Sequence, residues 1–266
     1  MPTDEIWITY PPYREWQFAS SIDTLPGELR LGTVLGVGGG LARNPIQFDQ
    51  HGHIVARLVS TLPWVPIVLR VKDSRIANIH LVRAAGALGF SGIVADDESL
   101  CDALREDLCT EPRGRALATF LRACFPGADA AVRDEALGLL VSGLDRGEEL
   151  RLPAAVAAGR SKRLRRDRLP SPERLRRSGQ LISVVLDVQR NSSLHLSRLA
   201  ELHGYASGSS LDRALRRRFR AGVTAMRQTL GWQPWLARAL CPDQMLRGTR
   251  GYRANLGSSP VSTRSA

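Results

Sequence analysis

Lysine is almost missing from this chain of 266 residues, which has only Lys72 and Lys162 among its 37 basic side chains. A codon bias toward arginine explains the residue type, but it does not explain the distribution of charge. Through Thr110 the chain has 9 basic and 13 acidic residues, which leaves 28 basic and 13 acidic residues for positions 111–266. This strongly basic C-terminal half indicates a polyanionic partner, most often a nucleic acid and less often an anionic membrane surface.

Cysteine is scarce as well. The four that occur, Cys101, Cys109, Cys124 and Cys241, form no Cys-x-x-Cys pair. The N-terminus lacks a secretory pattern, and no apolar run approaches the roughly 20 residues that span a bilayer. We therefore expect reduced thiols that fill a core, in a cytoplasmic protein that does not cross a membrane.

Complete catalytic and cofactor motifs are also lacking. The glycine cluster that ends at Gly40 does not have the spacing of a dinucleotide-binding loop, and no Lys-Ser or Lys-Thr pair follows it. His51 and His53 have no third ligand spaced to complete a metal site. We therefore expect neither enzymatic activity nor a cofactor. The alternative is an α/β enzyme of unknown reaction, which the basic half would tether to nucleic acid.

The first 110 residues predict an α/β domain. Residues 1–26 mix prolines and aromatic side chains without a sustained period, so we expect an irregular lead-in, and Leu29–Val37 predicts a buried strand. Helical spacing and short apolar runs then alternate, with helices at 53–62, 77–89 and 99–108 and strands at 64–71 and 90–96. Strands that alternate with helices imply a parallel sheet with crossover connections.

The alternation over residues 54–108, with Pro66 entering one strand and an Ala-Gly-Ala-Leu-Gly-Phe turn entering the next, is similar to the last third of response-regulator receiver domains. A working receiver needs clustered carboxylates, a phosphoacceptor Asp and a late lysine, and this chain lacks them at the equivalent places. The resemblance implies a degenerate receiver-like domain that forms homodimer contacts or binds an unknown signal. Asp96, Asp97 and Glu98 could hold a divalent cation, but before a helix they better suit its N-terminal dipole.

The basic half predicts a DNA-binding region over residues 131–240, after a linker region over 111–130 and before a disordered tail over 241–266. Helices are expected at 116–125 and 131–144. A short helix over 152–158, a turn at Gly159 and a basic helix over 161–169 predict a first helix-turn-helix, in which Lys162, Arg163 and Arg166 contact DNA. Ser171, Pro172 and Glu173 then open a joining helix with an apolar stripe.

The segment Leu194–Arg227 predicts a second helix-turn-helix. Its first helix breaks at Gly204, and its second helix begins after Ser207, an N-cap that we also count among the DNA contacts. Projection at about 100° per residue separates an apolar side with Leu211, Leu215 and Phe219 from a polar side with Ser209, Arg213, Arg216, Arg217 and Arg220. In the major groove, Ser209 and Arg213 would read bases, and the other three arginines would hold phosphates.

This second motif resembles the corresponding half of the DNA-binding region of AraC-type transcriptional regulators. The matching positions are Gly204, Tyr205, Ser207, Ser209, Leu211, Arg213, Arg217, Phe219, Val223, Thr224 and Arg227. His203 departs from the pattern at an apolar position, and Arg220 departs from it at a glycine. The resemblance covers about residues 131–230. It implies a bacterial regulator that reads two successive major-groove segments of double-stranded DNA through two motifs joined by a helix.

Overall fold

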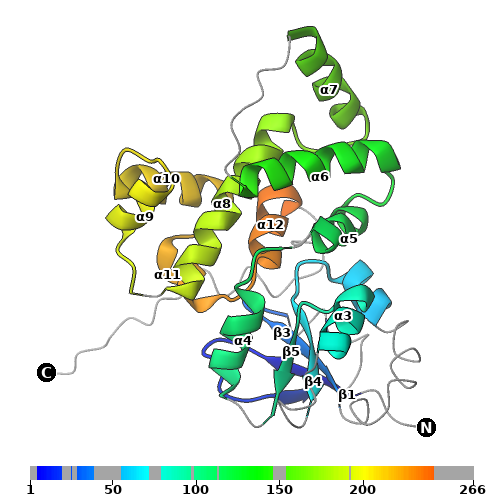
Figure 1. Ribbon diagram of the computed structural model, residues 1–266, viewed down its shortest axis with the longest axis vertical. Helices are drawn as coiled ribbons and strands as arrows, with labels where there is room; N and C mark the ends of the chain where they lie inside the picture. Colours follow the sequence, from blue (N-terminus) through cyan, green and yellow to red (C-terminus); the bar gives the residue numbers. More distant parts are fainter. Residues whose placement is uncertain are drawn as a thin grey trace, which may run out of the picture.

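The computed structural model has a sheet-containing N-terminal part and a helical C-terminal part (Figure 1). It describes residues 5–19, 25, 29–38, 55–71, 79–96, 99–112, 114–145, 154–191 and 193–242. The sheet lies at one end of the molecule, and the helices that follow residue 114 extend away from it. An α/β part followed by a helical part was the arrangement expected from the sequence.

The sheet is mixed, which corrects the prediction of an all-parallel sheet. Its strands among the described residues are β1 (Glu5–Thr9), β2 (Gln17–Ala19), β3 (Val34–Gly38), β4 (Ile67–Val71) and β5 (Gly92–Ala95), in the order β2-β1-β3-β4-β5. Strands β3, β4 and β5 are parallel, as predicted. Strand β1 runs antiparallel to both of its neighbours, β2 and β3.

The irregular lead-in predicted for residues 1–26 is wrong at Glu5–Thr9 and Gln17–Ala19, which form strands, whereas residues 10–16 between them have no helix or strand. Strand β1 buries Ile6 and Ile8 in the core, while Trp7 between them points to the other face of the sheet. The strand pairs with β3 from Glu5 to Thr9. A run of five residues, followed closely by two prolines, has too few alternations to stand out in the sequence.

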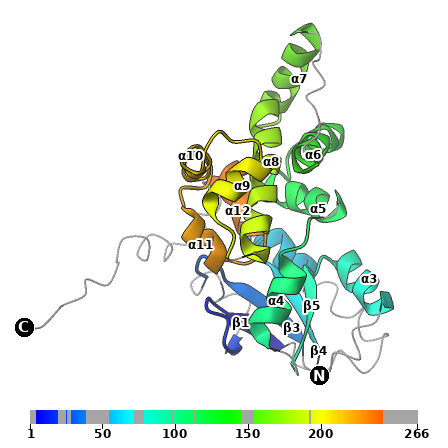
Figure 2. The same ribbon diagram turned by 60° about the vertical axis from the view of Figure 1, so that its left-hand side comes forward.

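Helices cover both faces of the sheet, as Figures 1 and 2 show. On one face, α4 (Leu100–Leu108) packs Leu104 into a buried cluster with Val34 and Val68. On the other face, the helical residues 55–61 and α3 (Ile79–Leu88) contribute to the larger core that contains Leu35. The three helices predicted for this half are therefore confirmed.

Several predicted features lie outside the described residues. They are the glycines at 39 and 40, the pair His51 and His53, the carboxylates Asp97 and Glu98, and the tail beyond Pro242. Each of these stays a prediction.

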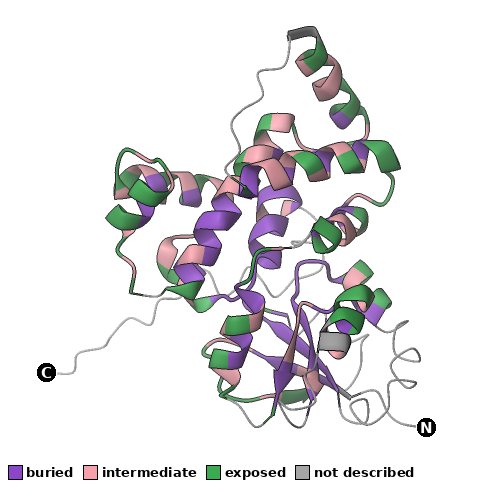
Figure 3. Ribbon diagram, in the orientation of Figure 1, coloured by how far each residue is buried: buried purple, intermediate pink, exposed green. Residues whose placement is uncertain are grey.

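The C-terminal part is organised around one long helix. Its helices are α5 (Gly114–Cys124), α6 (Ala130–Leu144), α7 (Ala154–Arg166), α8 (Pro172–Arg190), α9 (Leu196–Leu202), α10 (Gly208–Phe219), α11 (Val223–Gln228) and α12 (Gln233–Leu240). Helix α8 runs through the middle and is buried along much of its length (Figure 3). It begins as predicted, because Ser171 Oγ accepts a hydrogen bond from the Arg174 N–H at 3.3 Å and Pro172 occupies the first turn.

Helices α6 and α8 cross in direct backbone contact at two glycines. A Cβ atom on Gly143 would overlap the carbonyl oxygen of Arg176, and one on Gly179 would overlap the carbonyl oxygen of Leu140. Only glycine permits so close an approach of the two backbones. The pair α6 and α8 forms the centre against which other helices of this part pack.

The two parts of the chain share one continuous apolar core. One buried cluster contains Leu35 of β3 and Leu186 of α8. It also contains Phe120 of α5 and Trp232 before α12, whose rings meet edge to face with 5.6 Å between their centroids. Leu230 joins the cluster on the α4 face of the sheet, and its N–H donates to the Tyr13 hydroxyl at 3.1 Å. Arg190 Nε of α8 donates to the carbonyl oxygen of Cys109 at 2.6 Å. The helical part is thus seated on the sheet, while the predicted boundaries at 110 and 130 stay predictions.

Candidate nucleic-acid interface

The turn between α9 and α10 begins at Gly204, where the sequence predicted the break. Gly204 has a φ of 69°, a left-handed conformation that suits glycine. The N–H of Gly204 donates to the Glu201 carbonyl at 3.1 Å, and the N–H of Tyr205 donates to the Ala200 carbonyl at 2.8 Å. This pair of bonds is the Schellman arrangement that ends helices.

Helix α10 starts with reciprocal serine caps. Ser207 Oγ accepts the N–H of Ser210 at 3.1 Å, and Ser210 Oγ accepts the N–H of Ser207 at 3.1 Å. The two bonds satisfy backbone donors that a helix start otherwise leaves open. Ser207 is therefore confirmed as the N-cap, and its own hydroxyl oxygen is engaged by the helix.

The two sides of α10 are those that the projection predicted. Leu211, Leu215 and Phe219 are fully buried, and the Phe219 ring packs edge to face on Trp235 of α12 at a centroid distance of 5.8 Å. The opposite side is exposed, and it carries Ser209, Arg213, Arg216, Arg217 and Arg220. An apolar underside thus holds the basic side toward solvent.

The exposed arginines differ in what they contact. Arg216 Nε lies 2.6 Å from Asp212 Oδ2, one helical turn earlier, so its charge is partly neutralised at the surface. Among the described residues, none accepts a hydrogen bond from the guanidinium of Arg213, Arg217 or Arg220. These three cations are available to an external anion.

A second group of arginines lies beside α10 and was missed by the sequence reasoning. Arg218 is half-buried, and burial together with the nearby charges of Arg174 and Arg177 lowers the pKa of its guanidinium. Arg174 donates to the Ala239 carbonyl at 3.0 Å, and the Arg177 guanidinium lies 5.0 Å from the centre of the Tyr205 ring. Arg174 and Arg177 belong to α8 and Arg218 belongs to α10, so spacing within either helix could not reveal this group.

The two departures from the AraC-type pattern have structural explanations. Arg220 ends α10 with a φ of 52° and a ψ of 34°, the left-handed conformation that the glycine of the pattern would adopt easily. The His203 side chain is buried, and its Nε2 lies 2.8 Å from Asp187 Oδ2 of α8. The polar ring therefore has a partner at an otherwise apolar position.

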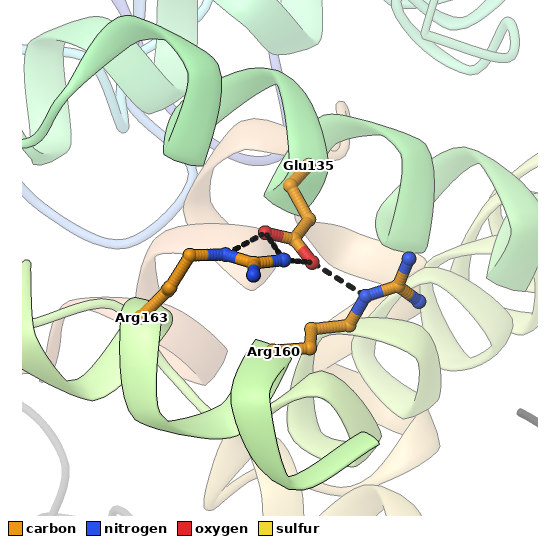
Figure 4. A network of polar contacts seen from close by, with 3 residues as sticks. All are labelled: Glu135, Arg160 and Arg163. Carbon is orange, nitrogen blue, oxygen red and sulfur yellow. Dashed lines mark hydrogen bonds and ion pairs between the residues drawn. The ribbon is translucent and has the colours of Figure 1, made fainter. Parts of the chain in front are cut away.

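The predicted first motif is wrong in its turn, because α7 continues through Gly159 without a break. Glu135 of α6 joins this helix to α6 through two arginines, as Figure 4 shows. Its carboxylate accepts a hydrogen bond from Arg160 Nε at 2.5 Å and another from an Arg163 guanidinium nitrogen at 3.2 Å. Both arginines belong to α7, so the ion pairs tie the helix to α6 on either side of Lys162.

The three predicted contact residues of α7 therefore differ in their surroundings. Lys162 is exposed, whereas Arg163 is exposed but already paired with Glu135. Arg166 is exposed and lies 3.2 Å from Asp167. The backbone N–H of Asp129, followed by Arg166, lowers the pKa of Asp167, which keeps this carboxylate charged. Lys162 is the least engaged cation of the three.

No family model matches the chain, and comparisons with curated proteins and with solved structures give no match either. Among the described helices, none is long and apolar enough to cross a membrane. The resemblance to AraC-type regulators therefore rests on the residues named above, and the function has to be argued from their geometry.

Proposed function

We propose that the chain is a sequence-specific transcriptional regulator that binds double-stranded DNA. In this proposal α9, its turn and α10 form a helix-turn-helix, and α10 enters the major groove. The observation that carries it is the exposed side of α10, where the guanidinium groups of Arg213 and Arg217 have no partner among the described residues. A buried underside of Leu211, Leu215 and Phe219 supports that side.

The order of side chains along α10 supports distinct roles. Ser209 and Arg213 lie in its first half and one turn apart, and the N-terminal residues of a recognition helix approach the bases in the major groove. Arg213 can pair with O6 and N7 of guanine through two parallel hydrogen bonds. Arg217 and Arg220 lie toward the other end, where phosphate contacts orient the helix.

The arginines beside α10 support an extended phosphate contact. Arg174 and Arg177 lie close enough to Arg218 for their charges to repel its own, and Glu173 offsets part of this repulsion. Phosphates would relieve the rest. Binding that neutralises several phosphates weakens steeply with salt, by a log–log slope of about 0.9 per phosphate.

A second contact comes from α7 in this proposal. Its exposed cations, Lys162, Arg165 and Arg166, lie on the helix that Glu135 ties to α6. We assign them to phosphates and not to bases, because the predicted turn at Gly159 is absent and α7 is one continuous helix. In this proposal α10 reads one major-groove segment, and the second base-reading segment expected from the sequence stays a prediction.

The test uses the full chain and DNA sites selected from a random pool. We expect Arg213→Ala to cost about 1–3 kcal/mol at the best site and to remove its preference over other sites. Arg217→Ala should weaken all sites alike and lower the salt slope by about 0.9. Footprinting in competitor DNA and salt titrations measure the two effects.

Arg83→Ala is the matched control, since Arg83 is an exposed arginine on α3. It should leave both affinity and preference unchanged. If no site is protected above competitor DNA, the chain is a non-specific nucleic-acid binder. If Arg213→Ala and Arg83→Ala behave alike, α10 does not read bases.

A further inference from the structure

A pocket of about 720 Å³ opens on the α4 face of the sheet, separate from the basic helices. It lies where β4 and β5 end and α4 begins, and its walls include Trp7, Tyr13, Trp16, Arg70, Asp96 and Cys101. Crevices at the carboxyl ends of parallel strands are the usual ligand sites of open α/β sheets, and the volume suits a small molecule.

Arg70 forms the centre of this pocket and is held in one orientation. Its guanidinium carbon lies 4.4 Å from the centre of the Trp7 ring and 5.2 Å from that of the Trp16 ring. Its Nε and one terminal nitrogen lie 3.1 Å and 2.8 Å from Asp96 Oδ1. Gly36 makes this arrangement possible, because a Cβ there would collide with Arg70 and Trp16.

The pocket residues leave hydrogen-bonding capacity of both kinds. The indole N–H of Trp7 is buried, and no described residue accepts a hydrogen bond from it. Within the described part of the chain, Asp96 Oδ2 receives no donor, and the Asp96 side chain is 38% exposed. The Arg70 guanidinium donor therefore lies in the same pocket as an acceptor on Asp96, next to flat aromatic surfaces.

We propose that this pocket binds a planar heteroaromatic molecule whose edge carries a ring carbonyl next to a ring N–H, as in guanine. The carbonyl oxygen accepts from the Arg70 guanidinium, and the ring N–H donates to Asp96. The ring itself stacks on the Trp16 indole, because aromatic side chains and guanidinium planes are the surfaces on which bases stack.

The proposal is tested by calorimetric titration of the full chain with guanosine and, separately, with adenosine. The two nucleosides share the sugar and the fused ring, but adenosine lacks the ring carbonyl and the adjacent N–H. We expect guanosine to bind at least tenfold more tightly than adenosine. Asp96→Asn should weaken guanosine binding at least tenfold, since it removes the carboxylate that accepts the ring N–H, and Trp16→Leu should weaken both nucleosides.

Asp134→Asn on α6 is the matched control, because it removes an exposed carboxylate remote from the sheet and should leave guanosine binding unchanged. Circular dichroism of each variant checks that the fold is kept, and Trp16→Leu provides a second readout should Asp96→Asn disturb it. Equal affinity for the two nucleosides, no heat with guanosine at millimolar concentration, or full binding by Asp96→Asn would each overturn the proposal. None of these results depends on whether the chain binds DNA.

Discussion

Arg220 occupies a backbone conformation that is unfavourable for any residue with a side chain. Its φ of 52° places it in the left-handed region, where an L-residue costs about 1–2 kcal/mol. The same residue lies on the exposed basic side of α10. The position therefore combines backbone strain with a charge that the proposed function uses.

We predict that Arg220→Gly raises the free energy of unfolding by about 0.5–1 kcal/mol and weakens DNA binding through the loss of one phosphate contact. Glycine removes the strain, although its greater freedom in the unfolded chain offsets part of the gain. Arg220→Ala should weaken DNA binding equally without the gain in stability. Urea denaturation and salt titrations of both variants measure the two effects, and equal stability of the two variants would contradict the explanation.

The buried thiol of Cys109 makes the free energy of unfolding depend on pH in the alkaline range. Burial raises the pKa of its thiol from an ordinary value of 9.0 to about 11. In the unfolded chain the thiol ionises near 9, while in the folded chain it keeps its proton up to about 11, so the unfolded state gains as the pH rises between these values. The stability that this thiol contributes is complete below pH 9 and is lost toward pH 11.

We predict that, between pH 9 and pH 11, the free energy of unfolding of the wild-type chain falls more steeply with pH than that of the Cys109→Ala variant. The difference in slope should be on the order of 1 kcal/mol per pH unit. Denaturant titrations at pH 8, 9 and 10 measure the difference in slope. Parallel slopes for Cys109→Ala and the wild type would show that Cys109 is not the group responsible.

At the scale of helices, the crossing of α6 and α8 leaves no room for a side chain at its two glycines. We predict that Gly179→Ala destabilises the chain by about 1–3 kcal/mol, because its methyl group meets the backbone of α6. Gly159→Ala makes the same chemical change in α7, where a Cβ would meet nothing within 4 Å. That variant should stabilise α7 by about 0.5–1 kcal/mol, since alanine is the better helix former. Thermal denaturation compares the two, and a loss of stability in both would contradict the role of the crossing.

Elements with strong local features could be predicted from the sequence, and others could not. The start of α8 at Ser171, the break at Gly204 and the two sides of α10 all follow from interactions within a few residues. Strand β1 was missed because its pairing with β3 joins distant parts of the chain. The turn expected at Gly159 does not form, because one glycine inside a helix costs only about 1 kcal/mol and α7 continues through it.

The candidate sites show the same limit. The exposed arginines of α10 follow from a helical projection, since they share one helix. The approach of Arg218 to Arg174, and the stacking of Arg70 between Trp7 and Trp16, join residues on different elements. Tertiary packing alone brings these side chains together, and for that reason the pocket on the sheet was not anticipated.

At the scale of the whole molecule, the core passes from the sheet into the helices. We predict that an isolated segment 131–242 is less stable than the full chain by several kcal/mol, because Leu230 and Trp232 each lose apolar contacts worth about 1.5–3 kcal/mol. A segment 111–242 keeps Phe120 against Trp232 and should recover part of that loss. Calorimetric melting of the three chains gives the order, and equal melting temperatures would show that the helical part stands alone.

The phenol of Tyr13 has a consequence for communication across the molecule. It forms part of the wall around the sheet pocket, donates to the Gly32 carbonyl at 2.9 Å and accepts the N–H of Leu230. Leu230 leads into α12, whose Trp235 supports Phe219 beneath the basic helix. A compound that moves this ring would disturb the hydrogen bond to Leu230. If the proposed DNA binding responds to that change, DNA must change the affinity of the compound by the same factor.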